Sequence, residues 1–170
     1  MSAQGNAPPE DRPILLVDVD GVISLFGFDS QSPPEGRWLN VEGLPHLCSA
    51  RAAEHLPALS EDFDLVWCTG WEEKAGEHLS PLLGLDPPPP YLSFDRNPGK
   101  GHAHWKLAAI DDHAGPQRPL AWVDDALNEA CHDWARDRPG PTLLVTTDPA
   151  EGLVERHARE LRAWARELQK

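Results

Sequence analysis

The chain has 170 residues, of which 40% are hydrophobic and 25% charged, and its formal net charge at pH 7 is −13. This length suits one domain with a sizeable core. An acidic chain lacks the basic face that nonspecific binding to nucleic acids or anionic membranes requires, so we expect neither partner. No apolar run approaches the ~18 residues that span a bilayer. The three cysteines are scattered and lack C-x-x-C spacing, which indicates reduced thiols and a cytoplasmic location.

The first dozen residues, 1–12, are polar and contain prolines. They have no hydrophobic run after a basic start, so they do not resemble a signal peptide. We expect a disordered N-terminal arm here, followed by a single domain over residues 13–170.

Short apolar runs alternate with helical patterns along that domain. Five runs predict strands, the third weaker than the others: Ile14–Val17, Phe63–Cys68, Tyr91–Phe94, Leu120–Val123 and Thr142–Val145. Five patterns predict helices: Leu44–His55 with an end near Pro57, Glu72–Leu83, His104–Asp112, Ala126–Arg136, and a last one with Asp148 as its N-cap and apolar residues from Leu153 to Leu168. This alternation indicates an α/β fold, a three-layer α/β/α sandwich with a five-stranded parallel sheet in a Rossmann-like arrangement.

Polar residues follow three of the predicted strands. They are Asp18, Asp20 and Gly21 after the first strand, Thr69 and Gly70 after the second, and Asp124 and Asp125 after the fourth. In such sheets ligands bind beyond the carboxyl ends of the strands. Four carboxylates gathered there repel one another unless a cation lies among them. Oxygen ligands without matching His or Cys suit Mg²⁺, and Lys106, at the start of the next helix, can balance a bound phosphate.

Some of these residues have other interpretations. Lys100, in the loop 98–101, can reach the same place as Lys106. Thr69 can act as an N-cap for the helix that follows it. Asp125 can cap the next helix in the same way.

Four segments, taken in order, resemble the motifs of the haloacid dehalogenase (HAD) superfamily. The D-x-D-G pattern in Leu16–Val22 is similar to the first motif, and Trp67–Trp71 to the second, a strand that ends in Ser or Thr. Lys106 fits the third motif, and the acidic pair in Ala121–Ala126 fits the fourth. The resemblance covers nearly the whole domain and is closest to small HAD proteins of an actinobacterial type.

The resemblance implies a Mg²⁺-dependent phosphatase that acts through an aspartyl-phosphate intermediate. In that mechanism Asp18 is the nucleophile and Asp20 is the general acid and base. Mg²⁺ is held by Asp18, the Asp20 carbonyl and Asp124, with Asp125 as a ligand or bound through water. The phosphoryl oxygens are bound by residues of the second and third motifs and by the turn after Asp20: Thr69, Gly70, Lys106 and Gly21.

The substrate is predicted from the space left for a cap domain. HAD enzymes often carry a cap, and a cap that folds by itself needs on the order of 50 residues. Residues 22–40 leave room only for a small flap-like insertion, so we expect no large cap and an open site. Such a site suits phosphorylated small molecules or exposed phosphates on macromolecules, in a monomer or weak dimer.

Two alternatives come from other functional classes. A catalytically silent HAD-like module would bind phosphate or a protein, and a phosphotransferase would use an acceptor other than water. A phospho-receiver domain uses the same residue types on a parallel sheet, but its acidic pair follows the first strand. Here the acidic pair follows the fourth strand, which argues against that third class.

Overall fold

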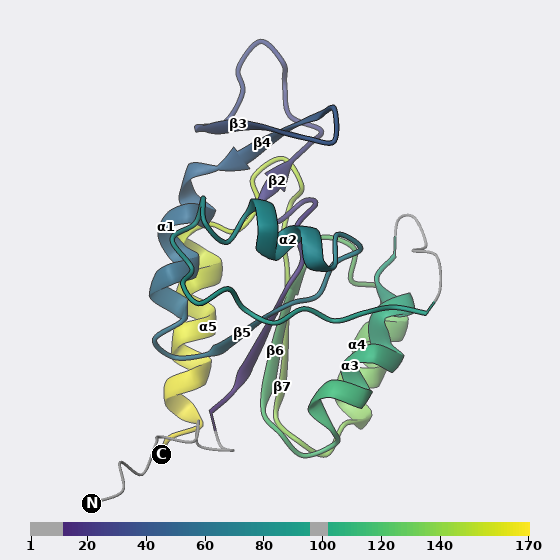
Figure 1. The fold of residues 1–170 in the computed structure, drawn as a ribbon. Coiled ribbons are helices and arrows are strands. Elements are labelled where there is room, and N and C mark those ends of the chain that lie inside the picture. The colour runs from purple at the N-terminus through teal and green to yellow at the C-terminus, as the bar shows by residue number, and fades with distance from the viewer. Residues whose placement is uncertain (1–11, 96–101) are drawn as a thin grey trace, which may run out of the picture.

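Four of the predicted strands form a parallel sheet in the middle of the molecule (Figure 1). The computed structural model describes residues 12–95 and 102–170. The strands β1 (Ile14–Val17), β5 (Asp64–Trp67), β6 (Leu120–Asp124) and β7 (Thr142–Thr146) lie side by side in the order β5-β1-β6-β7. β1 and β6 are buried along their whole length, as is typical of central strands in a sheet covered on both faces.

The predicted fifth strand, Tyr91–Phe94, is not a strand of this sheet. Tyr91 forms an isolated parallel bridge with Trp67, the last residue of β5. The Trp67 N–H donates to the Pro90 carbonyl over 2.8 Å, and the Leu92 N–H donates to the Trp67 carbonyl over 2.9 Å. The pairing cannot extend backwards, because the four prolines before Tyr91 have no N–H to donate. The expected five-stranded sheet therefore has four strands in the part of the chain that the structure describes.

Helices lie on both faces of the sheet, so the main body has three layers. α1 (Ala50–Leu59) and α5 (Glu155–Glu167) cover one face, and α3 (Leu107–Ala114) and α4 (Glu129–Asp137) cover the other (Figure 1). α5, with 13 residues, is the longest of the described helices, none of which is both long and apolar enough to cross a membrane.

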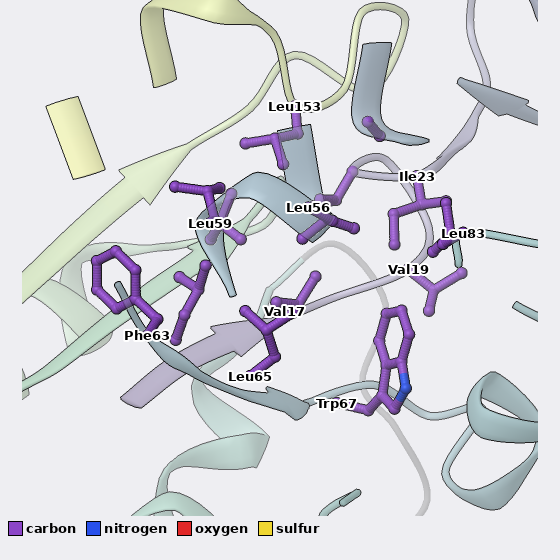
Figure 2. Packing of buried hydrophobic residues seen from close by; sticks show 14 of the residues in the cluster. Val17, Val19, Ile23, Leu56, Leu59, Phe63, Leu65, Trp67, Leu83 and Leu153 are labelled. Carbon is purple, nitrogen blue, oxygen red and sulfur yellow. The ribbon is translucent and has the colours of Figure 1, made fainter. Parts of the chain in front are cut away.

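The sheet divides the hydrophobic core into two clusters. β1 contributes to both, because successive side chains of a strand point to opposite faces: Leu15 and Val17 join one cluster, and Ile14 and Leu16 join the other. Figure 2 shows the cluster on the α1 and α5 face, with Val17, Val19, Ile23, Leu56, Leu59, Phe63, Leu65, Trp67, Leu83 and Leu153 labelled. Burying one such large side chain stabilises the fold by roughly 1.5–3 kcal/mol.

A small antiparallel sheet lies at the end of the molecule where β1 finishes (Figure 1). It contains β2 (Ser24–Leu25), β3 (Gly36–Val41) and β4 (Leu44–Ser49) in the order β2-β4-β3. We name these three strands and their turns the flap sheet. The predicted helix from Leu44 is wrong here, because β4 pairs with β3 over its full length and buries Leu47 against the core.

α1 begins only at Ala50, directly after the flap sheet. Ser49 is its N-cap, and its Oγ accepts a hydrogen bond from the Ala52 N–H over 3.2 Å. Pro57 lies inside α1 instead of ending it, and the helix continues to Leu59.

Three other helices differ in extent from the prediction. The helix expected over His104–Asp112 is a 3₁₀ helix over His104–Lys106 followed by α3 (Leu107–Ala114). α2 (Glu73–His78) is shorter than the predicted helix that runs to Leu83. α4 begins at Glu129 and not at Ala126, because Asn128 is its N-cap and accepts the N–H of Cys131 over 3.3 Å.

Asp148 is not the N-cap of α5. Its side chain accepts the Ala150 N–H over 2.9 Å within a turn that ends before the helix. α5 begins at Glu155, and there Nδ1 of His157 accepts the N–H of Val154 over 3.1 Å. The acceptor that stabilises the start of this helix is therefore a histidine in its first turn.

Candidate active site

Two neighbouring strands bring Asp18 and Asp124 together. Val17, the last residue of β1, lies in register with Trp67 of β5 and Val123 of β6. Asp18 is the residue after Val17, and Asp124 is the last residue of β6. The register of the parallel sheet therefore places both side chains at one edge, as the sequence pattern indicates.

Asp18, Asp124 and Asp125 form a carboxylate cluster at this edge. One oxygen from each of them lies within 4.8 Å of the other two. Asp18 is 7% exposed and Asp124 only 1%, so water solvates these two carboxylates poorly. Closely spaced, partly desolvated oxygen donors are the type of set that binds a hard divalent cation.

Lys106 is the basic residue of the cluster. It ends the short 3₁₀ helix η1 (His104–Lys106), and its side chain is buried. Its Nζ lies 2.6 Å from Oδ2 of Asp124 and 3.2 Å from Oδ1 of Asp18, and it donates to the Cys68 carbonyl over 3.0 Å. Lys100, its sequence alternative, lies outside the described residues. Lys106 therefore contacts the carboxylates on which the prediction depends.

The electrostatics of the cluster follow from its burial. Burial and the neighbouring Asp124 raise the pKa of Asp18 well above its usual value, although Lys106 opposes them. Burial and Asp124 also raise the pKa of Asp125, to about 6. Burial alone lowers the pKa of Lys106, but Asp18 and Asp124 outweigh it, so the net pKa is raised and the lysine is charged. One lysine does not balance three carboxylates, and the donor set fits an additional cation.

Thr69 and Gly70 follow β5 at the same edge. Thr69 is buried, and its Oγ1 accepts the N–H of Trp71 over 3.2 Å. It is not the N-cap of α2, since Glu72 occupies that position without a side-chain bond. Asp125 is not a helix cap either, because Asn128 caps α4. The capping alternatives for Thr69 and Asp125 are therefore wrong.

Asp20 and Gly21 lie in a tight loop after Asp18. The side chain of Asp20 is exposed to solvent, and its Oδ2 accepts a hydrogen bond from Nε1 of Trp71 over 3.2 Å. The Gly21 N–H, expected to bind phosphate, instead donates to the Ser24 carbonyl over 2.8 Å. Gly21 thus shapes the loop, and its amide is already paired.

The segment after β7 supports this loop from the far end of the sequence. Thr147 is buried, and its hydroxyl donates to the Gly21 carbonyl over 2.7 Å. The N–H of Leu153 donates to the Val22 carbonyl over 2.9 Å. Asp20 is therefore presented by a loop that two hydrogen bonds from this distant segment hold in place.

These residues line one cleft of about 680 Å³. Its polar lining includes Asp18, Asp20, Thr69, Gly70, Lys106, Asp124 and Asp125. Aromatic and imidazole rings complete the wall: Phe26, Trp71, His102 and Trp105. All the predicted site residues except Gly21 therefore meet around one space.

Most of the aromatic and imidazole rings that line the cleft could not be predicted from the sequence. Trp71 has a local signal, since it comes two residues after Thr69. Phe26 and His102 belong to no sequence motif, and only the tertiary structure brings their segments to the cleft. A scan against protein-family models and a search of curated proteins both returned no match to this sequence.

Proposed function

We propose that this chain is a Mg²⁺-dependent phosphomonoester hydrolase with an HAD-type core and Asp18 as its nucleophile. The observation that carries the proposal is the contact of a single buried lysine, Lys106, with both Asp18 and Asp124. These residues come from separate segments, and their order along the chain is the order of the HAD motifs. An accidental acidic patch on a solvated surface does not require a buried cation at its centre.

The cation is assigned to the carboxylate cluster. Asp18, the Asp20 carbonyl and Asp124 would hold it, and Asp125 would bind it directly or through water. The spacing of one oxygen from each of Asp18, Asp124 and Asp125, within 4.8 Å of one another, supports the three carboxylate ligands. Oxygen donors without a cysteine or histidine favour Mg²⁺ over zinc. When bound, Mg²⁺ neutralises charge on the phosphoryl group and orients it for in-line attack.

The covalent step begins at Asp18. A carboxylate oxygen of Asp18 forms a bond to phosphorus while the bond from phosphorus to the leaving oxygen breaks. Asp20 donates its proton to that oxygen, and the alcohol leaves. Asp20, now ionised, takes a proton from water as the water oxygen bonds to phosphorus, and the bond to Asp18 breaks. Inorganic phosphate is released, and both side chains return to their starting states.

The transferred phosphoryl group is held by neutral and positive donors. The hydroxyl of Thr69 and the ammonium of Lys106 line the cleft and can bind its oxygens. Gly70 lets the ligand approach the backbone closely. The raised pKa of Lys106 supports a permanently charged donor at this position.

The substrate class follows from the small size of the flap sheet. Its strands run only from Ser24 to Ser49, too short for an independent cap domain. An open cleft accepts phosphorylated small molecules or an exposed phosphate on a macromolecule, and the net charge of −13 disfavours nucleic acids. Three unpaired, buried cysteines agree with a reducing cytoplasm.

The test is phosphate release from p-nitrophenyl phosphate with and without Mg²⁺. We expect turnover that requires Mg²⁺ and that the Asp18→Asn variant abolishes, because an amide cannot act as the nucleophile. Asp112→Asn, an exposed position on α3, is the matched control and should keep full activity. Equal rates for the wild type and Asp18→Asn, or no turnover of any phosphomonoester by the wild type, would contradict the proposal.

A further inference from the structure

The indole of Trp71 makes a directed contact with the side chain of Asp20. Its Nε1 donates to Oδ2 of Asp20 over 3.2 Å. An indole N–H can only donate, so this oxygen of the carboxyl group must be the acceptor. The proton that a general acid needs is then left to the other oxygen, Oδ1.

Trp71 is in turn held by the flap sheet. The ring of His46, on β4, lies with its centroid 4.8 Å from that of Trp71, and the two planes meet at 64° in an edge-to-face arrangement. This geometry is favoured between aromatic rings because the positive edge of one meets the negative face of the other. Trp71 also packs against the hydrophobic core. Its indole therefore has a defined position.

His46 is in turn connected to the loop that carries Asp20. Nδ1 of His46 lies 2.8 Å from the buried Oγ of Ser24, on β2. The Ser24 carbonyl accepts the Gly21 N–H over 2.8 Å, and Asp20 and Ser24 form an isolated bridge. The loop that presents Asp20 is thus connected to Trp71 both through its carboxylate and through the flap sheet.

We propose that Trp71 is a positioning residue for Asp20, and that the flap sheet fixes Trp71 through His46. The inference rests on the proposed function, in which Asp20 is the general acid. Trp71 itself transfers no proton. It orients the exposed carboxyl group so that Oδ1 carries the proton toward the leaving oxygen.

If Trp71 orients the general acid, its loss should affect substrates according to how much their leaving group needs a proton. As the bond from phosphorus to the leaving oxygen breaks, its electron pair stays on that oxygen, which takes the Asp20 proton. A p-nitrophenolate ion is stable without that proton, whereas an alkoxide is not. Loss of the orienting contact must therefore slow the hydrolysis of alkyl phosphates much more than that of p-nitrophenyl phosphate.

The experiment compares kcat/KM for glycerol phosphate and p-nitrophenyl phosphate in the wild type and in Trp71→Phe. Phenylalanine keeps an aromatic ring against His46 but has no N–H. A positioned general acid contributes roughly 10²–10⁴-fold to the rate. We expect kcat/KM of the variant to fall about tenfold for glycerol phosphate and to change little for p-nitrophenyl phosphate. His46→Ala, which leaves Asp20 and Trp71 in the chain, should shift the same ratio in the same direction.

Trp38→Phe is the matched control. Trp38 also belongs to the flap sheet, on β3, but it is 59% exposed and does not line the cleft. Its variant should leave the ratio unchanged. If Trp71→Phe or His46→Ala slows both esters equally, or slows neither, the positioning role is overturned while the proposed function stands. If the wild type hydrolyses no ester, the proposed function itself fails.

Discussion

The α-carbon of Gly21 lies so close to the carboxylate of Asp125 that no side chain fits between them. A Cβ built on Gly21 collides with Cγ, Cβ and Oδ2 of Asp125. Gly21 also has φ +82°, a backbone conformation that favours glycine. The loop that carries Asp20 is therefore packed directly onto the acidic pair, and the glycine of the D-x-D-G pattern is needed for that packing.

Gly21→Ala is expected to damage the site beyond the cost of backbone strain. The alanine must push Asp125 away, so both the binding of Mg²⁺ and the turnover of p-nitrophenyl phosphate should fall. Gly43→Ala is the matched control: Gly43 has φ +84°, yet a Cβ there meets nothing within 4 Å. Both variants carry strain of about 1–3 kcal/mol, but only Gly21→Ala should lose activity. Equal activity in the two variants would show that Gly21 does not constrain the acidic pair.

Mg²⁺ is expected to stabilise the folded chain against heat. A ligand that binds only the folded state adds about 2.7 kcal/mol when its concentration is 100 times its dissociation constant. Asp124→Asn should remove most of this effect, since Asp124 belongs to the carboxylate cluster. The readout is the melting temperature in EDTA and in rising Mg²⁺, with Asp112→Asn as a control that keeps the wild-type response. A melting temperature that does not respond to Mg²⁺ would contradict the ligand assignment.

Lys106→Met is expected to destabilise the chain strongly in EDTA. The substitution keeps an unbranched side chain up to Cε, but it removes the ammonium group and leaves Asp18 and Asp124 buried without their cation. Breaking a buried ion pair in this way costs about 3–5 kcal/mol. Mg²⁺ should restore part of the stability, because it replaces the missing positive charge, while turnover stays low. Urea unfolding with and without Mg²⁺ measures both effects.

The control for this experiment is Lys74→Met. Lys74 pairs with Glu42 over 2.9 Å on the surface, where solvent screens the interaction. Its loss should change the unfolding curve little, and this small change should be the same with and without Mg²⁺. If the two lysine variants behave alike, the central role of Lys106 in the cluster is wrong.

Asp20→Asn should separate proton transfer from metal binding. The proposed metal ligand is the backbone carbonyl of Asp20, which the substitution preserves, so the stabilisation by Mg²⁺ should remain. Turnover of alkyl phosphates should fall by about 10²–10⁴-fold, the usual contribution of a general acid and base. The checks are the melting temperature in Mg²⁺ and the rate at saturating Mg²⁺. If Mg²⁺ no longer raises the melting temperature of the variant, while the variant still hydrolyses alkyl phosphates, the roles assigned to the carbonyl and the side chain of Asp20 are wrong.

His157 is expected to make the stability depend on pH. Burial, followed by the charge of Arg156, lowers the pKa of His157 below its usual 6.5, and its Nδ1 accepts the Val154 N–H only when unprotonated. As the pH falls below about 6.5, the unfolded chain takes up this proton first, so the free energy of unfolding decreases until the folded state is protonated as well. Above that pH the contribution is complete.

The test for His157 is the glutamine variant. Gln in the third position of a helix can also accept the N–H at the helix start, but it does not titrate. As the pH falls from about 8 to about 5.5, the free energy of unfolding should decrease more for the wild type than for His157→Gln. The wild-type value minus the variant value should therefore become smaller. A difference that stays constant over this range would exclude the linkage.

The parts of the fold that depend on local pattern could be read from the sequence. Ile14–Val17 is an uninterrupted apolar run, and it is a strand with those same bounds. The positions of Asp18 and Asp124 then follow, since the residues at the ends of neighbouring parallel strands must meet. The position of Lys106 depends instead on tertiary structure, because its Nζ donates to the carbonyl of Cys68, 38 residues away in the sequence, and no local pattern predicts that contact.

The errors arise where tertiary pairing overrides the local pattern. Leu44, Leu47 and Cys48 recur at helical spacing, yet the turn at Glu42 and Gly43 folds this segment back onto β3. Pairing with β3 then satisfies the backbone hydrogen bonds of this segment, so its helical spacing does not predict its structure. The contact between Trp71 and His46 depends on that same hairpin, so no sequence signal announces it.

The hydrogen bond from Thr147 to the Gly21 carbonyl joins residues 126 positions apart. A ribosome releases the segment that carries Asp18 early in translation, but it releases Thr147 and Leu153 only when most of the chain has been made. Until then the loop around Asp20 has no support from that side. The Asp20 loop is therefore completed only after β7 and the segment that follows it have been made. A fragment cut before Thr147 would keep Asp18 and Asp20 but would lose both the hydrogen bond to Gly21 and the α5 layer of the core.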